Sequence, residues 1–261
     1  ELIRNVPILL LVFIFLYVPI VILVVFSFND SRRNIIWRGF TTEYYFKALA
    51  NDSLREAFLN SLLVAGVTTV LSTVLGCLLA IALWRFRFPG KAVLEGANAL
   101  PIVIPEICLG VALLIFFSRL GLLAGLGWPF GLLPVIIGHV TSCFPFVTVV
   151  IRARLAGFDR ALEEASLDLG ASEWQTFWRV LVPYLRPALI AGALLAATIS
   201  LDDFVVTFFT IGPETLTLPV KIYSMVRFGA TPEVHAASTV LIAITLLLTF
   251  VAMRLQRLPR L

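Results

Sequence analysis

Charge is scarce in this sequence. Only 14% of its 261 residues are charged, whereas 60% are hydrophobic and the mean hydropathy is +1.00. A soluble domain of this length would expose far more charge. The composition therefore excludes an ordinary water-soluble protein and predicts a polytopic membrane protein.

Cysteine and histidine are also rare. Cys77, Cys108 and Cys143 each lie inside an apolar run, their number is odd, and no CxxC spacing occurs. We expect small apolar packing residues rather than disulfides or a metal site. His139 also lies in an apolar run, where a buried histidine with satisfied ring nitrogens is a better interpretation than a ligand.

Motifs for nucleotide, nucleic-acid or catalytic chemistry are missing. Gly90-Lys91 has no glycine five positions before Gly90 and is followed by Ala92, so it cannot form a phosphate loop. No basic stripe with interleaved aromatic residues suggests a nucleic-acid partner. A membrane enzyme is a weak alternative, because no set of nucleophile, base and metal ligands is present.

Long apolar runs predict six transmembrane helices in a single domain that spans residues 1–261. The predicted spans are 7–28, 60–83, 97–117, 132–151, 187–210 and 234–253. The first run is too long for a signal-peptide core and lacks a small-residue cleavage site, so we expect a retained span. The fold class is therefore an all-α polytopic membrane protein that contacts membrane lipid.

The distribution of arginine and lysine predicts that both termini are cytoplasmic. Basic residues gather after the second and fourth spans and at the end of the chain: Arg85, Arg87, Lys91, Arg152, Arg154, Arg160, Arg179, Arg186, Arg254, Arg257 and Arg260. The link 152–186 is then cytoplasmic and the link 29–59 external. Within the external link, Ser53 and Glu56 fit a capping box at the start of a helix that continues into the second span.

Small residues recur at every fourth position in two spans, which lets helix backbones approach closely. They are Ser72, Gly76 and Ala80 in the second span, and Gly192, Ala196 and Ser200 in the fifth. The alternative is that small residues are simply common in spans.

The link 152–186 contains a polar segment that a bilayer span cannot hold. Strong helix formers fill 161–169, and Gly170 favours a left-handed turn that ends a helix. Ser172 could cap a second short helix, whose aromatic face comprises Trp174, Phe177 and Trp178. Two interpretations remain open: a docking element for a soluble partner, or a solvated connector.

This segment resembles the EAA loop of permease subunits of ATP-binding-cassette (ABC) importers. Glu164-Ala165-Ser166 is followed after three residues by Gly170, and after nine more by Val180-Leu-Val-Pro183. The resemblance implies a type I ABC importer permease fold, with Glu164, Ala165, Ser166, Gly170 and Pro183 at an ATPase-coupling contact. It also implies a cytoplasmic ATP-binding subunit dimer, a second homologous permease and a periplasmic solute-binding protein. ATP and Mg would be bound by the partner ATPase, and no cofactor by this chain.

Three acidic residues lie inside apolar runs, where an unpaired charge is costly. Glu106 follows Pro101 and Pro105, which could loosen the third span, and Asp202 and Asp203 lie in the fifth. Adjacent helical residues point about 100° apart, so the two aspartates cannot share one direction. One hypothesis is an acidic substrate pathway for a cationic solute. The alternative is a buried carboxylate that is paired or capped by backbone.

Several segments resemble the second permease subunit of bacterial spermidine/putrescine importers. They are Ser27-Phe-Asn29, Gly39-Phe40, Asn60-Ser-Leu62, Ser200-Leu-Asp-Asp-Phe204 and Leu218-Pro-Val-Lys-Ile-Tyr223. The resemblance implies polyamine import across a bacterial inner membrane. The alternatives are an ABC importer for another solute, or an ion-coupled secondary transporter, although no internal repeat supports the latter.

Overall fold

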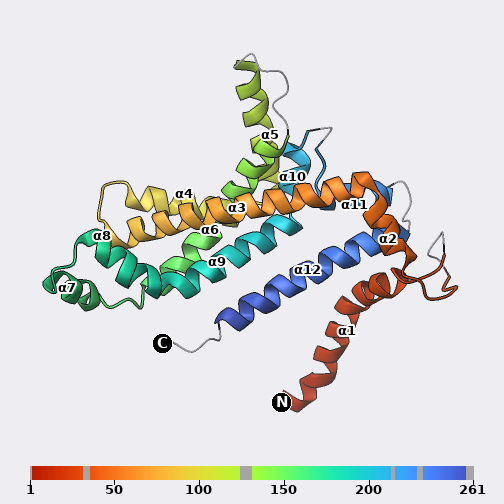
Figure 1. Ribbon diagram of the computed structural model, residues 1–261, viewed down its shortest axis with the longest axis horizontal. Coiled ribbons are helices and arrows are strands. Elements are labelled where there is room, and N and C mark those ends of the chain that lie inside the picture. Colours follow the sequence, from red (N-terminus) through yellow and green to blue (C-terminus); the bar gives the residue numbers. More distant parts are fainter. Residues whose placement is uncertain (1, 32–35, 124–130, 213–214, 228–231, 257–261) are drawn as a thin grey trace. The chain divides into compact units, whose positions relative to one another are not determined.

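The computed structural model describes residues 2–31, 36–123, 131–212, 215–227 and 232–256. Throughout these residues the chain is helical, apart from turns and an isolated antiparallel bridge between Asn29 and Phe40 (Figure 1). The helices are α1 (Leu2–Phe26), α2 (Glu43–Ala50), α3 (Asp52–Arg85), α4 (Lys91–Val103), α5 (Glu106–Leu123), α6 (Leu132–Leu155), α7 (Ala161–Asp168), α8 (Glu173–Thr176), α9 (Val182–Asp202), α10 (Val205–Thr210), α11 (Leu218–Arg227) and α12 (Pro232–Gln256), with a π-helix η1 (Phe177–Leu181) before α9.

Within the described residues, five helical segments are long and apolar enough to cross a membrane, and a bent helix pair makes six if its two helices count as one span. The five are Leu9–Phe26, Asp52–Arg85, Leu132–Leu155, Glu173–Asp202 and Pro232–Val251. The third predicted span is bent by 110° between α4 and α5. Pro105 causes the break, because a proline excludes the preceding residue from the helical region, and Ile104 is extended (φ −70°, ψ 135°).

The fifth predicted span, 187–210, is wrong at both ends. A continuous helix starts much earlier, at Glu173, and ends at Asp202, where Asp203 turns to an extended conformation before α10. Pro183 fits inside this helix because η1 widens the turn that precedes it: Val182 N–H bonds to Phe177 O, five residues back. Pro183 therefore lies inside a continuous helix and is not the boundary between the loop and the fifth span.

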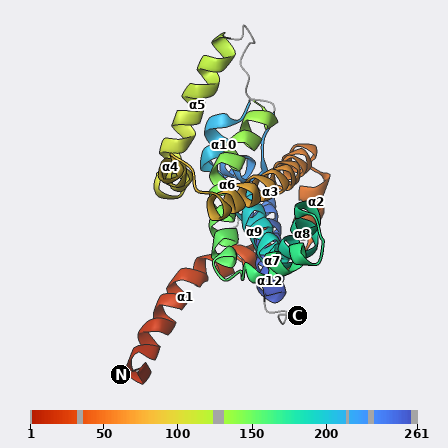
Figure 2. The same ribbon diagram turned by 90° about the vertical axis from the view of Figure 1, so that its left-hand side faces the viewer.

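The chain divides into two compact units, residues 1–59 with 217–244 and residues 60–216 with 245–261. In the second unit, α6 is the central helix and packs on α9, α10 and α4. Figure 2 shows α10 beside α5, with which it also packs. The core of this unit is built from residues of α3, α6, η1 and α9 and from the turn that follows α6: Ala80, Cys143, Val147, Ile151, Leu155, Phe158, Leu181, Leu185, Ala188 and Ala196.

Glycines permit the close packing of α6. A Cβ atom on Gly76 of α3 would lie 2.8 Å from Val147 Cβ, and a Cβ atom on Gly192 of α9 would lie 3.0 Å from Val147 Cγ1. Val147 therefore fills a space that two missing side chains leave open on two neighbouring helices. Gly76 and Gly192, one from each run of small residues, thus lie at helix contacts, which favours close approach of helices over the alternative that small residues are simply common in spans.

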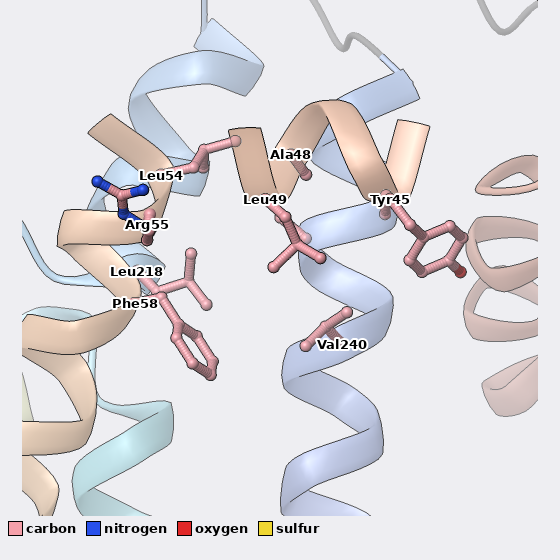
Figure 3. Close-up of a pocket in the computed structure, with 10 residues that line it drawn as sticks. Tyr45, Ala48, Leu49, Leu54, Arg55, Phe58, Leu218 and Val240 are labelled. Carbon is pink, nitrogen blue, oxygen red and sulfur yellow. The ribbon is translucent and has the colours of Figure 1, made fainter. Parts of the chain in front are cut away.

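The first unit joins α1, α2, α11 and the N-terminal parts of α3 and α12. Asn51, rather than Ser53, caps α3: Leu54 N–H donates to Asn51 Oδ1 at 3.2 Å. The predicted capping box of Ser53 and Glu56 is therefore wrong, since Asn51 ends α2 and leaves its side chain free to start α3. An apolar pocket of about 290 Å³ lies beside this turn, with Leu49, Phe58 and Val240 in its wall (Figure 3).

Some predictions from the sequence are not tested by the described residues. Arg257 and Arg260, which support the topology, fall outside the described residues, as do Arg32 and Arg33 of the external link. The single-domain assignment 1–261, the links 29–59 and 152–186, and the orientation of the termini stay predictions.

The glycine at position 76 provides a test of the packing. We expect Gly76→Ala to lower the free energy of unfolding by about 1–3 kcal/mol, because the new methyl group overpacks against Val147. Gly66→Ala on the same helix is the matched control, since no atom lies within 4 Å of its added Cβ. Thermal unfolding of the purified protein in detergent measures both. Equal stability of the two variants would contradict the packing argument.

Candidate functional site

The polar loop begins with a well-defined helix, α7. Asp159 Oδ1 accepts the Ala161 N–H at 2.9 Å and so satisfies a free amide at the helix start. At the other end Gly170 is left-handed (φ +85°), and two backbone bonds close the helix: Gly170 N to Leu167 O at 2.9 Å and Ala171 N to Ser166 O at 3.1 Å. This pair of bonds is a Schellman motif, and it confirms the predicted turn at Gly170.

A capping box starts the second helix of the loop. Gln175 N–H donates to Ser172 Oγ at 3.3 Å, and Ser172 N–H donates to Gln175 Oε1 at 2.9 Å. Ser172 is therefore the cap that the sequence predicted. Its partner Gln175 was not predicted, although Ser-x-x-Gln is the spacing of a capping box.

A side-chain hydrogen bond ties the two short helices together. Ser166 Oγ lies 3.0 Å from Thr176 Oγ1, and Thr176 is buried. The α8–η1–α9 helix then continues without interruption through Pro183. Ser166 and Gly170 thus shape the loop, and the loop is a folded element rather than a flexible connector.

The exposed side of the loop combines acidic and apolar groups. Glu164 and Ala165 are exposed on α7, and Leu169 has 89% of its surface exposed. On the second helix, the rings of Trp174 and Trp178 lie 5.6 Å apart and both are more than half exposed. Exposed tryptophans on a rigid support are typical of protein interfaces.

Asp203 is part of a buried polar network at the break between α9 and α10. Its side chain is 7% exposed, and its Oδ1 accepts Thr207 N–H at 2.9 Å and Thr207 Oγ1–H at 3.1 Å. His139 of α6 is 2% exposed, and its Nε2 lies 3.4 Å from Asp203 Oδ1 and 2.7 Å from Thr207 Oγ1. Sequence reasoning did not find this pairing of His139 with Asp203.

One set of donors and acceptors satisfies the whole network. The Thr207 hydroxyl has one proton, so when it donates that proton to Asp203 Oδ1 it accepts from His139 Nε2–H. The other ring nitrogen, Nδ1, lies 2.7 Å from Ser200 Oγ. His139 is thus buried with both ring nitrogens bonded, as the sequence predicted, and Asp203 Oδ1 lies against both Thr207 and the His139 ring.

Asp202 and Glu106 differ from Asp203 in their surroundings. Asp202 is exposed on the last turn of α9, and Glu106 is exposed at the first residue of α5, immediately after the Pro105 break. Among the residues that the structure describes, neither carboxylate has an ion-pair partner. The two neighbouring aspartates thus have different surroundings, one exposed and one buried.

A match to a known family covers most of this architecture. Residues 72–259, which include the polar loop and the Asp203 network, match the binding-protein-dependent transport system inner membrane component family. The chain belongs to this family. Membership confirms a multi-pass membrane protein of the permease class.

The chain is similar to three curated permeases over nearly its whole length. It is 41% identical to the spermidine/putrescine transport system permease protein PotC of Escherichia coli K12, over 94% of this chain and 91% of that protein. It is 40% identical to PotC of Haemophilus influenzae, over 94% and 93%. It is 39% identical to the putrescine transport system permease protein PotI of Escherichia coli K12, over 95% and 89%.

Solved structures share the fold. A bacterial ABC transporter involved in the import of alginate matches with a TM-score of 0.72 and 17% identity, over 96% of this chain and 94% of that one. The MetNI methionine ABC transporter matches with a TM-score of 0.58 and 20% identity, over 77% and 92%. At these identities the likeness confirms the predicted all-α ABC importer permease fold.

The aspartate pair provides a test of the network. We expect Asp203→Ala to lower the free energy of unfolding by about 1–3 kcal/mol, because it leaves the buried Thr207 N–H without an acceptor. Asp202→Ala should stay within about 0.5 kcal/mol of the parent, since its side chain is exposed and unpaired. Thermal unfolding in detergent measures both, and the reverse ranking would refute the assignment of Asp203 as the structural member.

Proposed function

We propose that this chain is one of two permease subunits of an ATP-driven importer of polyamines in a bacterial inner membrane. The observation that carries the proposal is the folded loop 161–176, which presents Glu164 and Ala165 on a helix fixed at both ends. A helix of this kind can transmit a rigid-body shift from a soluble subunit to the spans. A solvated connector would not need two caps and a tie between its helices.

The similarity to PotC and PotI supports polyamines as the substrate class. A probable sulfate permease of Chlorokybus atmophyticus is less similar, at 30% identity over 75% of this chain. Polyamines carry several ammonium groups, which unpaired carboxylates can attract. An importer for another solute is the alternative.

Asp202 is the aspartate that we assign to the solute pathway. An unpaired carboxylate within a span is costly unless it faces a wet cavity or a partner. Asp203 is buried and its Oδ1 is already engaged by Thr207 and His139, whereas Asp202 is exposed at the same break in the span. Glu106, exposed at the other break, is a second candidate for the acidic lining.

The proposed transporter has four kinds of component. A cytoplasmic ATPase dimer binds ATP and Mg and grips the loop at Glu164, while both termini of this chain face the same cytoplasmic side. A second homologous permease completes the pathway, and a periplasmic binding protein delivers the solute. ATP binding opens the pathway outward, and hydrolysis resets it.

An ion-coupled carrier is the second candidate. It would use Asp202 or Glu106 to bind protons or sodium ions. The capped loop would then have no role in transport. The ABC importer accounts for both the loop and the acidic residues, so we prefer it.

Charge reversal on α7 tests the docking contact. In proteoliposomes that contain all the transporter subunits, we expect Glu164→Arg to lower solute-stimulated ATP hydrolysis by about tenfold or more, because a misplaced charge at a contact costs several kcal/mol. Glu56→Arg, an exposed charge reversal in the predicted external link, is the control for a nonspecific effect of charge. Undiminished ATP hydrolysis with Glu164→Arg would argue against docking at this helix.

Neutralising Asp202 tests the cation pathway. We expect Asp202→Asn to reduce putrescine and spermidine uptake by about fivefold, equivalent to the loss of one modest charge contact of about 1 kcal/mol. Uptake of radiolabelled polyamine into proteoliposomes, with thermal stability measured in parallel, provides the readout. Full uptake by a folded Asp202→Asn variant would remove Asp202 from the pathway, and transport driven by an ion gradient without ATP would refute the importer itself.

A further inference from the structure

An aromatic cluster joins the ends of three long helices next to the polar loop. We call it the aromatic joint: Trp84 near the end of α3, Phe158 in the turn after α6, and Tyr184 near the start of α9. Phe158 lies in the middle, with its ring centroid 5.7 Å from Trp84 and 4.9 Å from Tyr184, both edge to face. Phe158 is buried, and these are separations at which aromatic rings attract.

An arginine covers each outer ring of the joint. The Arg160 guanidinium lies 4.7 Å from the Trp84 ring centroid, and the Arg154 guanidinium lies 4.2 Å from that of Tyr184. Arg154 and Tyr184 are also joined by two hydrogen bonds, Arg154 Nε to Tyr184 O at 3.3 Å and Tyr184 Oη to Arg154 O at 3.2 Å. Because Arg160 immediately precedes α7, the joint extends into the loop helix.

A second contact holds α7 against α3. Arg85 Nη1 of α3 lies 3.3 Å from Glu163 Oε1 of α7, and the Glu163 side chain is only 13% exposed. At its other end, α7 is tied to the second loop helix through Ser166 and Thr176. The loop helix is therefore attached to α3 at its start and to the α9 helix at its end.

The backbone connections of α7 alone would transmit little of its displacement to the spans. A turn at Gly157 precedes α7 and the left-handed Gly170 follows it, so the helical backbone is interrupted on both sides of α7. A push on α7 could then be absorbed by rotation at these turns. Side-chain contacts that bridge the turns prevent this loss of motion, because packed contacts switch between discrete arrangements rather than deform continuously.

We propose that the aromatic joint, together with Arg85 and Arg160, transmits the displacement of α7 to α3 and α9. This inference rests on the proposed function, in which an ATPase moves α7. The arginines and the three aromatic residues act as positioning residues, since they set how far the spans follow the loop. Docking of the ATPase, by contrast, uses the exposed side of α7 at Glu164.

The double variant Arg85→Gln/Arg160→Gln separates transmission from docking. It removes both charged links from α7 to α3 while it leaves the buried rings in place. In proteoliposomes that contain the complete transporter, we expect stimulated ATP hydrolysis to persist and the polyamine imported per ATP hydrolysed to fall about fivefold or more, the lower end of typical coupling between sites. Arg152→Gln is the matched control, because its ion pair with Glu95, at 3.0 Å, joins α6 to α4 instead.

The ratio of import to hydrolysis decides the proposal. The proposal is overturned if the double variant imports as much polyamine per ATP as the parent, including the case in which import and hydrolysis fall together. The aromatic joint would then be a structural support only. In the Arg85→Gln background, Arg160→Lys keeps a cation over Trp84. We expect this variant to import more polyamine per ATP than Arg85→Gln/Arg160→Gln does. A purely structural role of Arg160 does not predict this recovery. A parent complex whose ATP hydrolysis fails to respond to polyamine and binding protein would refute the proposed function, independently of the joint.

Discussion

The packing of α6 against α9 holds the two candidate functional regions together. Val147 sits against Gly192 of α9 and Gly76 of α3, so three helix backbones meet where two side chains are missing. Toward one end of α6, His139 reaches the break between α9 and α10. Toward the other, the chain leaves α6 through Phe158, which packs on Tyr184 of α9. A change in the packing of α6 against α9 would therefore alter both the His139 network and the contacts of Phe158.

The break after Asp202 is possible because its polar groups are satisfied locally. In an apolar environment an unpaired peptide group costs several kcal/mol, so spans break only where other donors and acceptors replace the helical bonds. Asp203 accepts the Thr207 N–H at the start of α10, and His139 joins the network from α6. Without these donors, the free-energy cost of burying the Asp203 carboxylate would exceed the gain from the hydrogen bonds that it accepts. Asp203 and His139 therefore stabilise the break as a pair.

Local signals in the sequence predicted most of the polar loop. Gly170 and Ser172 act on their own helix ends, so residue type and spacing suffice. Pro101 and Pro105 predicted that the third span is loosened there, and the chain bends at Pro105. The break at Asp203 was not predicted, because hydropathy averaged over a span does not register a single residue that leaves the helix. The pairing of His139 with Asp203, and the joint at Phe158, connect segments that are distant in the sequence and become visible only when helices pack.

The free energies of the contacts indicate which of them hold the aromatic joint together and which set the orientation of α7. A partly exposed ion pair such as Arg85 with Glu163 contributes about 0–1 kcal/mol, and an exposed cation over an aromatic ring about 0.5–1 kcal/mol. Each edge-to-face ring pair contributes about 0.5–1.5 kcal/mol beyond the burial of its apolar surface. The buried rings at Phe158 therefore hold the three helices together, whereas the arginines fix the angle at which α7 is attached. A loop that moves the spans needs both the ring packing and the arginine contacts. With the ring packing alone, α7 could rotate without moving α3.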